Sequence, residues 1–289
     1  MQRLLTISDL TAPDNDWKPL LDHVSALQAI HTRYKATMRG DRHIEVHIGG
    51  NKSRAPGLHA SELCGCLRQA AYSLLGAEKQ VEEGSTDVNM LMRFDIGHLL
   101  HALLQDDFQR MCLMMDGRLV FEDEVRINEK TCDVAAHYKI ASSTDGIFAF
   151  YDEHDSPYLR VGLEIKSKSA PEYEKLKKPL VENTMQGTLY QKCHDLPLMW
   201  YLYYNKSNSN YTPPLFPWLV TFSASEWNAV ESRAKQVHTF VQQGTLPERE
   251  EGMPCSWCPY AKACEPTYNS RSAARTTSTP PTQRVRRLT

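Results

Sequence analysis

Three segments before residue 116 carry apolar residues at the three- and four-residue spacing of an amphipathic helix. We expect helices over Trp17–Met38, Ser61–Leu75 and Val88–Met115. Ser61 is a good N-cap for the second of these, and Gly76 is a good stop signal after it. The first part of the chain is therefore predicted to be helical.

After residue 117 the pattern changes to short, partly alternating stretches rich in β-forming residues. We expect strands over Arg118–Asn128, Cys132–Ile140, Ile147–Tyr151, Leu159–Ser167, Leu198–Tyr204 and Leu215–Phe222, and helices over Glu172–His194 and Ser225–Gln243. This order predicts a protein of the α/β class, in which helices flank a small mixed sheet, with a helical N-terminal region and a C-terminal cysteine cluster.

The predicted division of the chain is an N-terminal extension (1–60), a main domain (61–268) and a tail (269–289). From Ser270 onward the tail holds five arginines and no acidic residue, among many Ser, Thr and Pro residues. Such a composition cannot bury a core, so we expect a disordered basic tail. Contact with a phosphate backbone is the alternative role for it.

Bulk composition excludes few functions. The chain has 289 residues, 41% of them hydrophobic, which suffices for one large domain or two small ones. A net charge of −2 does not indicate a nucleic-acid partner, which would need a local basic surface. No signal-like or membrane-spanning segment is present, so we expect a cytoplasmic protein without a membrane partner.

The segment from Val161 to Lys168 carries the first candidate chemistry. Glu164 and Lys166 stand two positions apart, on one face of a predicted strand, and Asp145 precedes them. Carboxylate oxygens suit Mg²⁺ or Mn²⁺, and a bound cation can position a water for phosphodiester hydrolysis. Alone, Glu-x-Lys is expected by chance about once in a chain of this length, and Asp145 before Gly146 is most often a plain turn.

Two predicted helices add candidates. His101 offers an imidazole for a metal, and Gly97, one turn earlier, would let another element approach closely. His98 is a rival without such a glycine, and either histidine can be an ordinary helix residue. Gln186 and Tyr190 lie one turn apart on the helix after Lys166 and can donate hydrogen bonds to phosphate.

Taken in chain order, these residues resemble the PD-(D/E)XK nuclease superfamily, and its RecB-like branch in particular. The matching motifs are Gly97/His101, Asp145, Glu164/Lys166 and Gln186/Tyr190, within residues 60–265. Thr144 replaces the usual proline before Asp145, and Ser143 stands where glycine is common. The resemblance implies a restriction-endonuclease-like core and a Mg²⁺- or Mn²⁺-dependent DNA nuclease.

The resemblance also implies a role for each residue. His101, Asp145, Glu164 and the carbonyl of Ile165 would hold the metal, and Lys166 would activate the water. Gln186 and Tyr190 would position the DNA strand, and Lys168 would at most contact a neighbouring phosphate.

The eight cysteines fall into two kinds. Cys112, Cys132 and Cys193 are isolated and expected in the core. Cys255, Cys258 and Cys264 form a tight cluster that resembles the iron–sulfur nucleases of the same branch, such as the CRISPR-associated RecB-like exonucleases and the AddB-type subunits. That resemblance implies a 4Fe–4S cluster with Cys66 as fourth ligand, since Cys66-Leu-Arg68 ahead of Tyr72 fits the family pattern and Cys64 does not. Four thiolates also suit a structural Zn²⁺.

The functional prediction is an exonuclease that acts on single-stranded or end-containing DNA in recombination, repair, replication or phage DNA metabolism. No P-loop sequence is present, so the chain is expected to be either a stand-alone nuclease or a subunit that borrows a motor. In the second case a helicase, a recombinase or a single-strand-binding protein is the expected partner, and the expected source is a prokaryotic or phage-infected cell. One alternative is a catalytically inactive nucleic-acid-binding or assembly module. Another is a metal-stapled interaction protein in which Glu-x-Lys is coincidence. The sequence leaves open exonuclease against endonuclease action.

Overall fold

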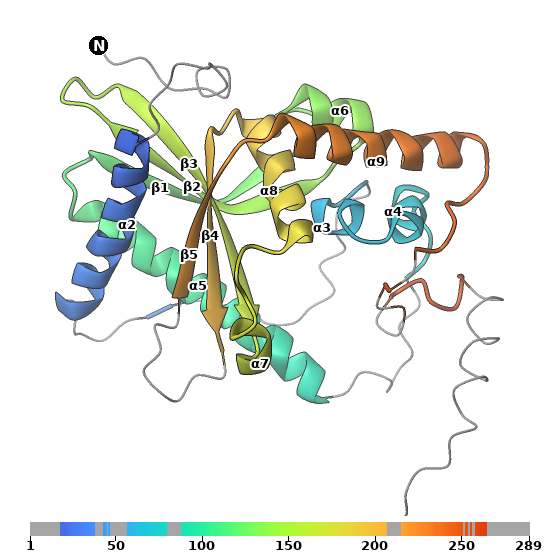
Figure 1. Cartoon of the computed structure of the whole chain (residues 1–289), viewed down its shortest axis with the longest axis horizontal. Helices are drawn as coiled ribbons and strands as arrows, with labels where there is room; N and C mark the ends of the chain where they lie inside the picture. The colour runs from blue at the N-terminus through green and yellow to red at the C-terminus, as the bar shows by residue number, and fades with distance from the viewer. Residues whose placement is uncertain are drawn as a thin grey trace, which may run out of the picture.

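The computed structural model describes residues 18–37, 43, 44, 46, 57–79, 88–206, 215–250, 252, 253, 255 and 258–264. Within this part of the chain, five strands form one sheet in the order β1-β2-β3-β4-β5 (Figure 1). The strands are β1 (Leu119–Ile127), β2 (Ser142–Tyr151), β3 (Pro157–Lys168), β4 (Leu198–Asn205) and β5 (Leu215–Thr221). β3 and β4 run parallel, and the other neighbours are antiparallel. The mixed sheet flanked by helices confirms the predicted α/β class.

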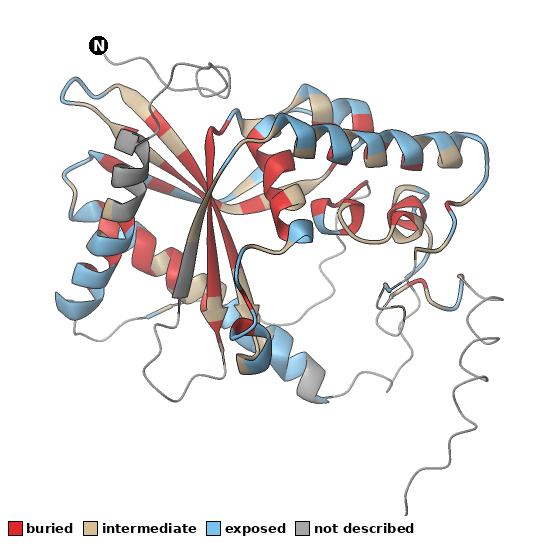
Figure 2. Cartoon of the chain, in the orientation of Figure 1, coloured by how far each residue is buried: buried red, intermediate tan, exposed pale blue. Residues whose placement is uncertain are grey.

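Helices cover both faces of the sheet. One face packs against α2 (Lys18–Thr37) and α5 (Val88–Leu113), around a core in which Phe108 contacts Phe121, Phe148 and Trp200. The other face packs against α8 (Val181–His194) and α9 (Ala224–Gln242), with the short helices α3 (Ala60–Leu63), α4 (Leu67–Leu74) and α6 (Asp133–Tyr138) beside them. The central strands are the most continuously buried elements (Figure 2). Alternate side chains of β3 therefore face two different helical layers.

The strand expected over Cys132–Ile140 is wrong, because this segment forms α6. Ala135 and Tyr138, three positions apart, both turn into the core, which is helical and not strand spacing. The helix ends at Lys139, which adopts a left-handed conformation at φ 50°.

Two long predicted helices are each interrupted. The Ser61–Leu75 helix is divided into α3 and α4 by the turn Cys64-Gly65-Cys66, and its N-cap is His59 instead of Ser61. Gly76 does end α4, with a φ of +66°. The Glu172–His194 helix is divided into α7 (Ala170–Tyr173) and α8, since Pro179 cannot continue a helix.

The turn expected at Asp145–Gly146 is also wrong, because both residues lie inside β2. Gly146 is needed there for a packing reason: a β-carbon at this position would lie 2.3 Å from the ring of Phe121. The predicted helices before residue 38, after residue 87 and after residue 223 are present within a few residues of their expected ends.

Cys112 is buried, and Cys132 and Cys193 are half-buried against the core between the sheet and helices α8 and α9, as expected. None of the helices in the described ranges is long and apolar enough to cross a membrane. The basic tail lies outside the described residues, and the division at residues 60 and 268 stays a prediction.

Candidate functional site

A fork between β2 and β3 forms the centre of the candidate site. The two strands pair as far as Gly146 and Leu163, whereas β2 stays paired with β1 as far as Ser142. Beyond the fork Ile165 pairs with β4 but no longer with β2, and its backbone N–H donates to Oδ2 of Asp145 at 2.5 Å. The Asp145 carboxylate is therefore fixed between the two strands by the end of their pairing.

Helix α5 holds Asp145 from the other side. Nδ1 of His101 lies 3.3 Å from Oδ1 of Asp145. Burial opposes charge on both groups, but their attraction prevails, so the pKa of His101 is raised and the pKa of Asp145 is lowered. The contact therefore favours a protonated His101 beside an ionised Asp145.

Gln105, one turn after His101, adds a contact that the sequence analysis missed. Its side-chain amide donates to the carbonyl of Asp145 at 2.9 Å and to Oε1 of Glu124 at 3.1 Å. Glu124 Oε2 in turn accepts from the hydroxyl of Ser143 at 3.0 Å. The spacing of four residues from His101 is the signal that places Gln105 on the same helix face.

Glu164 and Lys166 form an ion pair on the face of β3 that packs toward α8, where Lys166 contacts Gln186. The Glu164 side chain is only 2% exposed, and burial raises its pKa to about 7; Asp145 adds to this rise and Lys166 opposes it. Burial disfavours charge on Lys166 as well, yet the two carboxylates raise its pKa. Lys166 therefore stays protonated at neutral pH.

A chain of hydrogen bonds continues from Lys166 into α8. Nζ of Lys166 donates to Oε1 of Gln186 at 3.2 Å, and the Gln186 amide donates to the hydroxyl of Tyr190 at 2.7 Å. That hydroxyl lies 3.2 Å from Oγ of Ser142. Tyr190 is 1% exposed, so it contacts Gln186 and the fork and does not reach solvent.

The structure thus brings His101, Asp145, Glu164, Lys166, Gln186 and Tyr190 together at the fork. Ile165 contributes its N–H to Asp145, and the role of its carbonyl stays a prediction. His98 is exposed and His101 is not, which separates the two rivals. Gly97 lies beside Ser167, but a β-carbon there would be at an ordinary 3.6 Å from Oγ, so close approach does not require glycine.

The groups at the fork that could ligate a metal are each in contact with another group of the protein. Among the residues that the structure describes, no three His, Cys, Asp or Glu side chains converge on a point that would hold a metal ion. The set nevertheless fits a hard cation in chemistry, because Asp145 and Glu164 bring two carboxylates to the fork and His101 brings an imidazole. Carboxylate oxygens are the ligands that Mg²⁺ and Mn²⁺ prefer.

The cysteines form a second feature, at a small pocket between α4 and the residues after 248. Cys66, Cys255, Cys258 and Cys264 all line it. Burial raises the pKa of Cys258, and its three neighbours add to the rise, so the four thiols interact. Cys64 is not part of the lining. It is half-buried near Arg233, Glu164 and Lys166, and desolvation raises its pKa to about 12.

Side-chain contacts close this pocket. Tyr72 stacks on Tyr260 at 5.4 Å between ring centres, and its hydroxyl donates to the carbonyl of Ala263 at 2.8 Å. Nε of Arg249 donates to Sγ of Cys255 at 3.2 Å. The end of the described chain is therefore attached to α4 by its own side chains.

Arg233 of α9 holds the turn that carries Cys66. It donates to the carbonyl of Leu63 at 2.8 Å and to that of Gly65, and it forms an ion pair with Glu250 at 3.0 Å. Glu250 also accepts the backbone N–H of Leu67 at 2.8 Å. These contacts satisfy backbone groups that the break between α3 and α4 leaves without helical partners.

Sheet, helices and fork together define an α/β protein with a polar, carboxylate-rich site at a strand divergence. No protein-family model matches the chain, and no curated protein matches it. Similar solved structures include SSO0001, with 12% identity, a TM-score of 0.44, and coverage of 83% of this chain and 96% of that one.

The alkaline exonuclease LHK-Exo from Laribacter hongkongensis is also similar, with 13% identity, a TM-score of 0.39, and coverage of 66% of this chain and 91% of that one. The structure of LHK-Exo in complex with dAMP matches with 12% identity and a TM-score of 0.42, and the match covers 66% of this chain and 91% of that one. These likenesses are distant, and the fold class rests on the chain's own sheet and helices.

Proposed function

We propose that this protein is a metal-dependent DNA nuclease whose active site is the fork between β2 and β3. The observation that carries the proposal is the meeting of Asp145, Glu164 and Lys166 there, from two strands, with His101 from α5. Two carboxylates, an imidazole and an ammonium are the groups that metal-assisted phosphodiester hydrolysis uses. Their order in the chain is also that of the RecB-like nucleases that the sequence resembles.

The metal would be Mg²⁺ or Mn²⁺, held by His101, Asp145, Glu164 and the carbonyl of Ile165. Bound there, such an ion lowers the pKa of a coordinated water and neutralises charge on the phosphate. Because His101 must be neutral to act as a ligand, binding requires it to lose the proton that Asp145 favours.

Lys166 would stabilise charge and not act as a base. Its raised pKa keeps it protonated, so it can donate a hydrogen bond to the water or to the charge that develops on the phosphate. Gln186 fixes the position of the Lys166 ammonium, and Tyr190 holds Gln186. This assigns Gln186 and Tyr190 to the positioning of Lys166, in place of the direct strand contact that the sequence analysis expected.

The cysteine pocket would hold a 4Fe–4S cluster, with Zn²⁺ as the alternative, through Cys66, Cys255, Cys258 and Cys264. Four thiols on one small pocket support a four-thiolate site. The group would close a loop from Cys66 to Cys264 and stabilise the fold, by on the order of several kcal/mol.

One observation favours a second candidate, a nucleic-acid-binding or assembly module without catalysis. The donor groups at the fork do not converge on a metal position in the described part of the chain. The burial of Glu164 close to Asp145 opposes this alternative, since a module that needs no cation gains nothing from a buried carboxylate pair.

A strand-specific nuclease assay tests the proposal. End-labelled single-stranded and blunt duplex oligonucleotides are incubated with the full chain in Mg²⁺, in Mn²⁺ and in EDTA. We expect short products to accumulate progressively from the ends, with Mg²⁺ or Mn²⁺ only. Intact DNA under every condition, with a folded protein, contradicts the proposal. A helicase, recombinase or single-strand-binding partner would supply the unwound DNA.

A further inference from the structure

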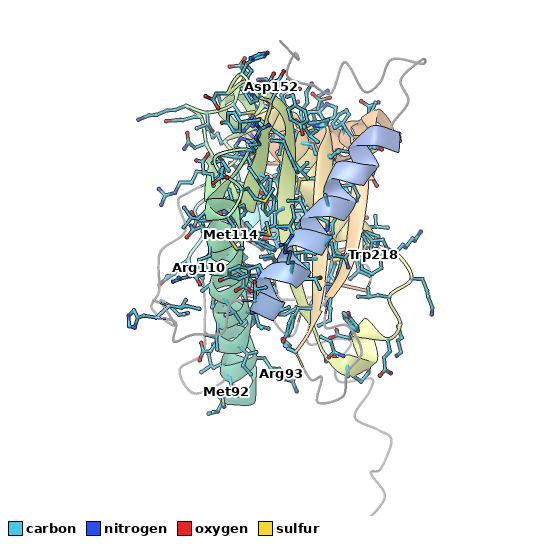
Figure 3. All side chains as sticks on the ribbon, turned by 90° about the vertical axis from the view of Figure 1, so that its left-hand side faces the viewer. Met92, Arg93, Arg110, Met114, Asp152 and Trp218 are labelled. Atoms are coloured by element: carbon cyan, nitrogen blue, oxygen red, sulfur yellow. The ribbon has the colours of Figure 1, made fainter. Side chains whose placement is uncertain are left out.

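The N-terminal half of α5 presents an exposed aromatic ring beside the candidate site. Phe94 is 58% exposed. It precedes Gly97 by three positions and His101 by seven, so all three share one side of the helix. Seven residues of helix span about 10 Å. Phe94 therefore lies roughly two turns from the imidazole at the fork. Figure 1 shows this half of α5 extending past the sheet, and Figure 3 shows Met92 and Arg93 on it.

Three cations gather where α5 passes the ends of β3 and β4. Lys168 ends β3, and Lys206 follows β4, with its backbone N–H donating to the carbonyl of Lys168 at 3.0 Å. α5 reaches the same place, since Gly97 lies beside Ser167, and Arg93 is one turn before Gly97. The three residues therefore come from three different elements.

The electrostatics show that these charges act on one another. Burial lowers the pKa of Lys206, Glu172 opposes this, and Arg93 and Lys168 lower it further. Glu172 already accepts hydrogen bonds from the N–H and hydroxyl of Ser169. A group of like charges with one occupied carboxylate nearby attracts an anion.

We propose that Arg93, Lys168, Lys206 and Phe94 form a surface that binds single-stranded DNA on its way to the fork. The inference rests on the proposed function and names the form of its substrate. The cations would contact phosphates, and the ring of Phe94 would stack on an unpaired base. A duplex keeps its bases stacked on one another, so it offers Phe94 no free base face.

Charge complementarity selects this occupant over an apolar partner. The opposite side of the same helix is exposed and apolar as well, at Val88, Met92 and Leu99, but there the cations of β3 and β4 are out of reach. Met92, at 56% exposure against 58% for Phe94, therefore provides a matched control on the same helix.

The test is fluorescence anisotropy of a labelled 15-nucleotide single strand with the full chain, in EDTA and again in Ca²⁺, at several salt concentrations. Phe94→Ala should weaken binding roughly tenfold, the effect of losing one stacked base. Arg93→Ala and Lys206→Ala should each reduce the slope of log K against log salt by about 0.7. Met92→Ala should bind like the wild type, and all variants should keep the circular dichroism of the wild type.

The inference is overturned if Phe94→Ala binds the single strand as tightly as the wild type, or if Met92→Ala binds it as weakly as Phe94→Ala. It is also overturned if Phe94→Ala weakens the binding of a blunt duplex as much as that of the single strand. No binding by the wild type in either EDTA or Ca²⁺ also overturns it. A loss of self-association on Phe94→Ala, seen by sedimentation, would assign the surface to a second copy instead. Hydrolysis by the wild type with unchanged Phe94→Ala binding refutes this inference alone. Phe94-dependent binding without hydrolysis refutes the proposed function alone.

Discussion

Gln105 holds the backbone of Asp145, through a hydrogen bond of 2.9 Å from its side-chain amide to the Asp145 carbonyl. His101, one turn earlier on α5, contacts the carboxylate of the same residue. Asp145 is thus fixed at its main chain and its side chain by one helix. Gln105 is only 8% exposed, so its amide has no ready exchange with water.

Gln105→Ala should therefore weaken metal binding without unfolding the protein. Residues that orient a metal ligand typically contribute 10- to 100-fold in affinity or activity, and we expect a loss in that range. Titration with Mn²⁺, followed by calorimetry, measures it directly. Gln236→Ala, at an exposed position of α9, is the control and should bind Mn²⁺ like the wild type. Equal Mn²⁺ affinity in the wild type, Gln105→Ala and Gln236→Ala would show that Gln105 does not position Asp145 for metal binding.

The raised pKa of Glu164 predicts an unusual dependence of stability on pH. The folded protein keeps a proton on this carboxyl up to a pKa of about 7, whereas the unfolded chain loses it near 4.5. The folded state therefore binds more protons between these values, and stability falls as pH rises through this window. The raised pKa of His101 acts in the same direction, above pH 6.5.

Urea unfolding of the metal-free protein at pH 5 and pH 8 measures this effect. The Glu164 contribution to the loss in unfolding free energy should be roughly 2 to 3 kcal/mol. Glu164→Gln cannot titrate, so its stability should change less over the same range, and added Mn²⁺ should stabilise the wild type most at pH 8. A Glu164→Gln variant with the pH dependence of the wild type would contradict the assignment.

Cys64 and Cys66 provide a matched pair for the cysteine pocket. Cys66 lines the pocket and Cys64 lies nearer Glu164, although the two residues are almost adjacent in the chain. After anaerobic purification, Cys66→Ser should lose the visible absorption and the bound iron, and Cys64→Ser should keep both. A colourless wild-type protein with stoichiometric zinc would favour the Zn²⁺ alternative. Equal metal loss in the two variants would contradict the choice of Cys66.

Two helical glycines, Gly97 of α5 and Gly187 of α8, should respond in opposite ways to replacement by alanine. A β-carbon at Gly187 would lie 1.8 Å from the hydroxyl of the buried Tyr201, so Gly187→Ala should cost about 1 to 3 kcal/mol or more. A β-carbon at Gly97 meets only Ser167 Oγ at 3.6 Å, so Gly97→Ala should be neutral or slightly stabilising, by up to about 1 kcal/mol. Thermal unfolding of both variants decides this, and a destabilised Gly97→Ala protein would show that the α5–β3 contact is tighter than described.

Much of the fold was predictable, because strands and long helices have a regular spacing of apolar residues in the sequence. β3 and β4 were placed within a few residues, since their apolar runs are strongly β-forming. The segment of α6 was assigned as a strand because residue preferences there are weak and tertiary packing decides. The break at Gly65 depends on contacts far along the chain, such as those of Arg233, which local patterns do not contain. The break before α8 follows Pro179, a local signal that the predicted Glu172–His194 helix did not take into account.

The candidate site was predictable in its members but not in its geometry. The order of motifs identified His101, Asp145, Glu164 and Lys166, and a helical spacing of four would have suggested Gln105. The fork itself depends on where pairing between β2 and β3 stops, and no local signal fixes that point. Hence the sequence placed Asp145 in a turn, whereas the structure places it inside a strand, with its carboxylate on the N–H of Ile165.

Single-turnover hydrolysis by the wild type and by Lys166→Ala tests the central claim most directly, with Lys178→Ala, an exposed lysine outside the fork, as control. We predict that wild type and Lys178→Ala degrade an end-labelled single strand in Mg²⁺ or Mn²⁺. Lys166→Ala should be slower by at least about 100-fold, the scale of losing one group that stabilises developing charge, with unchanged circular dichroism. Equal rates for wild type and Lys166→Ala would contradict the assignment of the fork as a hydrolytic site.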